Sequence, residues 1–213
     1  MRLLIAIFVI LNIAYASQNT FILNHSGLVD QRAYIKINEI GLEVKNKLNT
    51  QIYLDIKGDN GIDLKLDRKS RISLMKKIEK KLIEQVKKDS NFPFIILTFA
   101  LDQQHANILY SNDELKTIVD RDEILDGYVI PLLAAKDKNI LKSKVSAASL
   151  NGYAQIADSL AKHNNIELVS SIGSSGKVAS TIWKMVMYTV VLFGIIAYFI
   201  IILRERKIKN GNK

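Results

Sequence analysis

The stretch that decides the fold is Pro-Phe-Ile-Ile-Leu-Thr-Phe-Ala-Leu at residues 93–101. Its nearly continuous apolar run, bounded by polar turns, is typical of a central strand that is buried on both faces. Asp102-Gln103-Gln104 follows as a turn, and residues 105–110 are a second strand candidate, close enough to pair with the first as a hairpin. These two strands are predicted to form the antiparallel part of a sheet.

The sequence before and after this hairpin shows helical periodicity. Apolar residues from Val29 to Leu48 recur at helical spacing, and Asp30 stands where a carboxylate favours the positive end of the helix dipole. Residues 51–56 alternate as a half-buried strand, and residues 70–88 form an apolar stripe flanked by lysines. Further helices are predicted at 114–119, at 122–135 with an interruption at Pro131, and at 142–162. The pattern predicts an α/β fold in which helices flank a small mixed sheet.

A membrane anchor is predicted near the C-terminus. Residues 185–203 form a run of 19 uncharged, mostly apolar residues, followed at once by Arg-Glu-Arg-Lys. Such a run can cross a bilayer as a helix, which we assign to residues 182–203. Because the basic residues lie on its C-terminal side, the positive-inside rule places the tail 204–213 in the cytoplasm. The expected location is a bacterial inner membrane, with a single span and the N-terminal domain in the periplasm.

The N-terminus favours the same orientation. Arg2 precedes an apolar stretch from Leu3 to Ile13 that ends in Ala-Tyr-Ala, which is the pattern of a signal peptide cut after Ala16. The alternative is an uncleaved N-terminal anchor, which would leave the same domain outside. We expect a signal peptide at 1–16, one exported domain at 17–165 and a Ser/Gly-rich flexible linker at 166–181.

Charge and cysteine content restrict the possible partners. The chain has a net charge of +9, but Arg2 and the predicted tail contribute five of these charges. A nucleic-acid partner is therefore not expected for the exported part. Because the chain has no cysteine, disulfides, thiol catalysis and Cys-ligated metals are excluded.

The order of short motifs resembles the TPM domain family. The motifs are Gly27-Leu28-Val29-Asp30 opening a helix, then Ile118-Val119-Asp120 with Ile124 and Pro131 after it, and a closing helix with Ser-Ala-Ala-Ser-Leu-Asn-Gly-Tyr at 146–153. The resemblance covers roughly residues 24–161, and many bacterial members are also exported and tethered by a C-terminal span. It implies an α/β/α sandwich.

The same resemblance implies candidate activities and a candidate metal site. Plant members of the family look like acid phosphatases and repair helpers of photosynthetic complexes, animal relatives assist membrane receptors, and calcium or other divalent cations bind in parts of the family. Asp120 aligns with the family's Asp and is the best metal candidate, with Asp30 and Asp102 as companions from other loops. Calcium or magnesium would suit such oxygen ligands. The alternative is that the acidic residues around 120–126 begin a helix and are solvated.

No catalytic motif is recognised in the sequence. The three histidines have no ligand spacing, and there is no nucleophile elbow or phosphate loop. The lysine-rich helix could contact anionic lipid or an acidic partner through Lys76, Lys77, Lys80 and Lys81, although a solvated helix face would look the same. The expected function is a membrane-tethered periplasmic accessory domain that attends another envelope membrane protein. The alternative is a divalent-metal-dependent, phosphatase-like hydrolase.

Overall fold

Four strands form one mixed sheet in the order β1-β2-β3-β4. Strands β1 (Ile22–Asn24), β2 (Gln51–Lys57) and β3 (Phe94–Ala100) are parallel, whereas β4 (His105–Tyr110) is antiparallel to β3. The computed structural model describes residues 20–136, 139–171, 188–189 and 191–194. The hairpin and the strand expected at 51–56 are confirmed, whereas the short edge strand β1 is not indicated by the sequence pattern.

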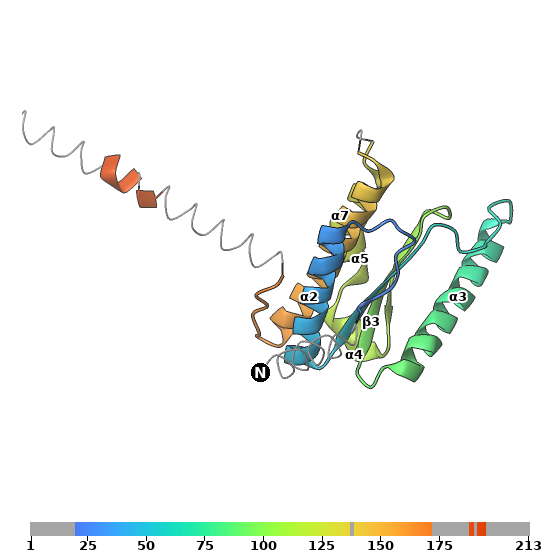
Figure 1. Ribbon diagram of the computed structural model, residues 1–213, viewed down its shortest axis with the longest axis horizontal. Helices are drawn as coiled ribbons and strands as arrows, with labels where there is room; N and C mark the ends of the chain where they lie inside the picture. Colours follow the sequence, from blue (N-terminus) through green and yellow to red (C-terminus); the bar gives the residue numbers. More distant parts are fainter. Residues whose placement is uncertain (1–19, 137–138, 172–187, 190, 195–213) are drawn as a thin grey trace, which may run out of the picture. The chain divides into compact units, whose positions relative to one another are not determined.

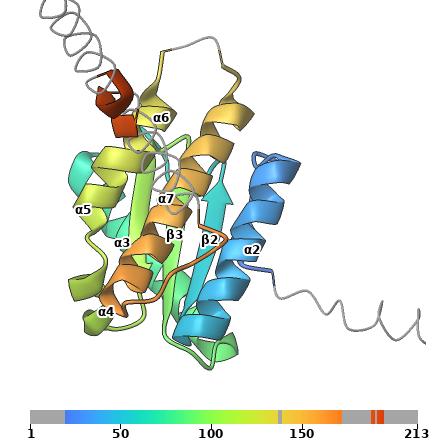
Figure 2. The ribbon, with the colours of Figure 1, turned by 90° about the vertical axis from the view of Figure 1, so that its left-hand side faces the viewer.

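Helices cover both faces of this sheet (Figures 1 and 2). Helices α2 (Gln31–Leu48) and α7 (Leu141–His163) lie side by side on one face, and α3 (Arg68–Asp89) lies on the other. All seven residues of β3 are buried, as expected for a strand that is covered on both sides. The predicted α/β fold with a mixed sheet flanked by helices is therefore confirmed.

Close packing fixes α7 against the sheet. A Cβ atom added to Gly152 would lie 2.6 Å from Cγ2 of Val129 and 3.1 Å from Cδ2 of Leu97, so only glycine fits without rearrangement. One residue further on, the buried Tyr153 hydroxyl donates a hydrogen bond of 2.6 Å to the backbone carbonyl of Ile52. Burial raises the pKa of Tyr153 well above its usual value, so the hydroxyl keeps its proton.

Helix α3 is attached to the opposite face by fewer apolar residues. Leu82 and Val86 are its two buried residues, and they pack against Phe94, Ile96 and Leu109 of the strands. These contacts lie in the C-terminal half of α3. The N-terminal half of α3 lies instead over the polar part of the sheet, where the candidate site is found.

The chain after β4 forms a series of short helical segments. These are α4 (Asp113–Ile118), α5 (Arg121–Ile124), the π-helical turn η1 (Leu125–Val129) and α6 (Ile130–Ala134). Pro131 lies in the first turn of α6, directly after η1, and has no N–H to donate to the preceding turn. The expected interruption of the helix thus takes the form of a π-helical turn just before the proline.

The packed domain continues beyond the boundary expected at residue 165. The Glu43 carboxylate on α2 accepts hydrogen bonds from the backbone N–H groups of Val169 at 2.9 Å and Ser170 at 2.8 Å. Leu168 is buried, and the compact unit extends through Ser171. Residues 166–171, which the sequence pattern predicts as the start of the flexible linker, thus contact α2 through Glu43 and through Lys47, whose ammonium donates to the carbonyl of Glu167.

Several sequence predictions fall outside the described residues. These are the signal peptide at 1–16, the linker beyond residue 171, the tail at 204–213 and all of the span at 182–203 except residues 188–189 and 191–194. Within the described part of the chain, no helix is both long enough and apolar enough to cross a membrane. The membrane span remains a prediction from the sequence.

Candidate functional site

Polar side chains gather on the α3 face of the sheet, toward the carboxyl ends of the parallel strands. Strand alternation places Asp55 and Thr98 on this face, because Tyr53 and Ile96 two residues earlier pack beneath α3. Asp55 is only 3% exposed, and its Oδ2 accepts a hydrogen bond of 3.4 Å from Thr98 and lies 3.6 Å from the Lys57 ammonium nitrogen. Burial raises the pKa of Asp55, and the attraction of Lys57 offsets only part of this rise.

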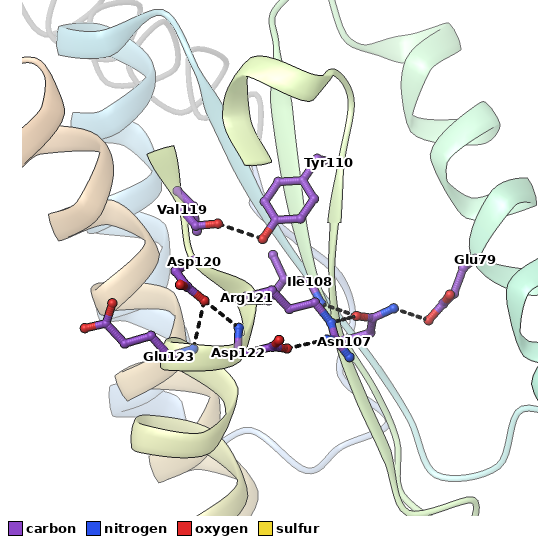
Figure 3. A network of polar contacts seen from close by, with 9 residues as sticks. All are labelled: Glu79, Asn107, Ile108, Tyr110, Val119, Asp120, Arg121, Asp122 and Glu123. Carbon is purple, nitrogen blue, oxygen red and sulfur yellow. Dashed lines mark hydrogen bonds and ion pairs between the residues drawn. The ribbon is translucent and has the colours of Figure 1, made fainter. Parts of the chain in front are cut away.

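Glu79 connects helix α3 to strand β4. Its Oε1 atom accepts a hydrogen bond of 2.7 Å from Nδ2 of Asn107 (Figure 3). The same Oε1 atom lies 2.8 Å from Nε2 of His105. Burial by itself raises the pKa of Glu79, but the hydrogen bonds from His105 and Asn107 outweigh it, so the net pKa is lowered. Glu79 therefore presents a negative charge on the face of α3 that covers the sheet.

Asn107 passes the connection on to α5. Its Oδ1 accepts a hydrogen bond of 2.6 Å from Nε of Arg121, whose Nη1 also pairs with the carboxylate of Asp122 (Figure 3). Tyr110 fixes the segment before α5, since its hydroxyl donates a 2.9 Å hydrogen bond to the carbonyl of Val119. Burial raises the pKa of Tyr110 to about 12, so this donor persists at any physiological pH.

Glu79, His105, Asn107 and Arg121 line a groove between α3, the β3–β4 hairpin and α5. The groove has a volume of about 300 Å³ and is called the basic groove below. Four of its lining residues are Lys or Arg, and Glu79 is its one carboxylate: the cations are Arg68, Arg71, Lys76 and Arg121. Its apolar lining comes from Ile62, Ile72 and Met75. The Nε atom of Arg71 is buried and has no hydrogen-bond partner among the described residues.

A polar loop holds the mouth of the basic groove in place. The Gln103 amide donates hydrogen bonds to Oδ1 of Asp59 at 2.6 Å and to the carbonyl of Ile62 at 3.2 Å, and it accepts one from the Asn60 N–H at 3.3 Å. This arrangement ties the loop after β2 to the hairpin. These hydrogen bonds hold Gln103 and Ile62, which line the groove, in fixed positions.

The structure gives the three predicted metal ligands other roles. Asp30 is the N-cap of α2 and Asp120 the N-cap of α5, each accepting backbone hydrogen bonds from the first turn of its helix. Asp102 lies in the turn after β3, where its N–H donates to the carbonyl of Gly58. Across residues 20–136 and 139–171, no three His, Asp or Glu side chains group closely enough to hold a metal ion. The three carboxylates are therefore not brought together.

The predicted contact lysines are all exposed on α3. Lys76 lines the basic groove, and Lys77, Lys80 and Lys81 lie further along the helix surface. Lys80 and Glu84 approach to 4.0 Å, which is a weak surface pair. The positive surface of α3 thus continues directly from the groove.

The sequence pattern does not identify Glu79, His105, Asn107 and Arg121 as a group. The available signal is the strand alternation itself, since His105 and Asn107 occupy alternate positions of β4 and so face α3. Polar residues on the inner face of a covered strand need partners, so they indicate a buried polar site.

Comparison with known proteins gives no assignment: no family model matches the chain, and a search of curated proteins finds no match. The resemblance to the TPM domain family stays a prediction from short motifs. The chemistry of the basic groove is the remaining guide. Guanidinium groups beside apolar side chains bind carboxylates or phosphates and can accommodate an apolar group beside the anion.

Proposed function

We propose that this protein is a membrane-tethered accessory domain of the bacterial envelope, which binds another membrane protein through the surface of α3 and the basic groove. The observation that carries the proposal is the basic groove, where four cationic side chains face a single carboxylate. The excess positive charge of this groove is complementary to an anionic partner. The tether itself is supported by the apolar run at 185–203 and by the basic residues that follow it.

The exposed lysines would extend this contact. The four predicted contact lysines on α3 are solvent-exposed: Lys76, Lys77, Lys80 and Lys81. Each can therefore approach an anionic surface without breaking a buried contact of the domain. A lysine near an anionic membrane surface contributes roughly 1 kcal/mol. The binding should weaken as salt is added, because exposed charges are screened over about 10 Å at 0.1 M.

Site-specific photo-crosslinking in native membranes tests this proposal. A photoreactive residue at Lys77 should crosslink to a discrete membrane protein, whereas one at Lys142 on α7 should not. Replacing the four α3 lysines by Gln should abolish the crosslink. The matched control replaces four exposed lysines elsewhere, namely Lys116, Lys136, Lys142 and Lys162, and should leave it unchanged. Equal loss of the crosslink in both variants would show that it depends on the net charge of the domain and not on the surface of α3, which would contradict the proposal.

A phosphatase-like hydrolase is the second candidate. It is favoured by the contact between His105 and Glu79 beside Arg121, because an imidazole held by a carboxylate can move a proton and a guanidinium can stabilise an oxyanion. Turnover of a phosphate monoester that is lost in His105→Gln would support this function. Turnover that needs added calcium or magnesium and is lost in Asp120→Asn would support the metal-dependent form predicted from the sequence.

A further inference from the structure

The arginines of the basic groove have N–H donors that their hydrogen bonds within the domain do not use. Arg121 uses two of its five N–H donors, one on Asn107 and one on Asp122. The Arg121–Asp122 pair is exposed and is therefore weak, so a ligand can replace Asp122 at little cost. Arg71 has a buried Nε atom with no hydrogen-bond partner among the described residues. Two guanidinium groups from different elements thus have donors for a ligand in the same groove.

The rest of the lining selects among anions. Ile62, Ile72 and Met75 supply apolar surface, and Glu79 remains ionised because its pKa is lowered. A compact phosphate dianion would leave the apolar surface uncovered and would be repelled by Glu79. A carboxylate carries a single charge, and in a peptide it comes with neighbouring side chains that can cover the apolar residues.

We infer that the basic groove binds an acidic peptide segment of the partner protein, whose carboxylate is held by Arg71 and Arg121 while an adjacent apolar side chain packs on Ile72 and Met75. This inference rests on the proposed function, since it names the chemistry of the partner's contact. The volume of about 300 Å³ is at the lower end of ligand sites, which suits one or two side chains of a segment that continues along α3. The lysines of α3 would then meet further acidic residues of the same segment.

Binding of the full-length chain in detergent to a fluorescent peptide of alternating Glu and Leu tests the inference. The expected result is salt-sensitive binding that is absent for the same peptide with Gln in place of Glu. Arg71→Gln should weaken binding about tenfold or more, which is the loss of a charge-assisted contact of roughly 1.4 kcal/mol. Arg32→Gln, which removes an exposed arginine from α2 on the other face of the sheet, should not change it.

A second variant guards against misfolding of Arg71→Gln. Lys76 is exposed at the groove, so Lys76→Glu should preserve the fold and still weaken peptide binding. Equal binding of the Glu and Gln peptides, or full affinity in both variants, would overturn the inference. Binding of inorganic phosphate or of anionic vesicles in place of the peptide would also overturn it, and the two probes would tell a free phosphate from a lipid headgroup.

The two proposals fail separately. If the peptide does not bind but Lys77 still crosslinks to a membrane protein, the acidic-segment inference is wrong and the accessory function stands. If the peptide binds but no membrane protein is crosslinked, the groove chemistry is correct and the proposed function is wrong.

Discussion

The side-chain amide of Asn107 joins three elements of the fold. Its nitrogen donates to Glu79 on α3 and its oxygen accepts from Arg121 on α5, while the residue itself belongs to β4. Glutamine carries the same amide, but its longer side chain would displace both partners. Asn107 therefore positions the carboxylate of Glu79 and the guanidinium of Arg121 in the basic groove.

Replacing Asn107 by Leu should destabilise the protein by about 1–3 kcal/mol, because it leaves the partly buried carboxylate of Glu79 without one of its donors. Chemical unfolding followed by circular dichroism measures the change. Asn46→Leu is the matched control on the exposed surface of α2, and it should lie within about 0.5 kcal/mol of the wild type. Equal effects of both variants would show that the network around Asn107 contributes nothing to stability.

Glu43 gives a stability that depends on pH. Burial tends to raise the pKa of Glu43, but hydrogen bonds from Lys47 and Ser170 and from the Val169 backbone lower it from 4.5 to about 2. Because the folded pKa lies below the unfolded one, the stabilisation is complete above about pH 4.5 and is lost as the pH falls through about 2.

Glu43→Gln should therefore lower the free energy of unfolding by about 1–3 kcal/mol at neutral pH. The gap between variant and wild type should close progressively from pH 4.5 to pH 2, as measured by unfolding at a series of pH values. Glu39→Gln on the same helix should show no such convergence, since Glu39 is half exposed and pairs with Lys36 on the surface. A pH-independent gap for Glu43→Gln would refute the assignment.

At the scale of elements, α7 packs closely against η1 and β3 at Gly152. Gly152→Ala should destabilise the protein by about 1–3 kcal/mol, because the new methyl group meets the buried Val129 and Leu97 side chains. Gly127→Ala in η1 is the control, since no atom lies within 4 Å of the added Cβ. Thermal unfolding should place Gly127→Ala at or slightly above the wild type. A stabilised Gly152→Ala would mean that helix propensity outweighs the clash.

The elements differ in how far the sequence predicts them. β3 and α2 follow from local patterns, a continuous apolar run and a helical repeat, and both are confirmed. β1 has three residues and is held by its pairing with β2, which is about thirty positions away, so no local pattern indicates it. η1 buries Leu125 and Val129 as an α-helix could, so a helical repeat alone does not distinguish the two.

The candidate site is less accessible to sequence reasoning for a related reason. His105 and Asn107 find their partner Glu79 at separations of 26 and 28 residues, and Arg121 meets Asn107 across 14. Each residue alone looks like an ordinary polar side chain. The acidic residues near 120 attract attention because they are adjacent in sequence, yet Asp120 serves to begin α5.

At the scale of the whole molecule, the predicted orientation can be tested because the chain has no cysteine. Single variants Ser143→Cys, in the exposed start of α7, and Asn212→Cys, in the predicted tail, provide unique labelling sites. A membrane-impermeant maleimide should label Ser143→Cys in intact spheroplasts and Asn212→Cys only after lysis, as the positive-inside rule requires. The opposite labelling pattern would show that the topology is the reverse of the predicted one. Labelling of both sites in intact spheroplasts would show that residue 212 is not in the cytoplasm.

The attachment of residues 166–171 to α2 also determines how the domain responds to mechanical force. Tension on the chain beyond Ser171 would act on this C-terminal segment before it acts on the sheet. The segment is held by the Glu43 bonds to Val169 and Ser170, by the Lys47 bond to the carbonyl of Glu167, and by the burial of Leu168 and Ser171. Release of residues 166–171 requires all of these contacts to break, and it would free six residues, or about 20 Å of chain. In the predicted membrane-tethered protein, Glu43 is thus one of several contacts that must break before this segment can lengthen the connection to the membrane.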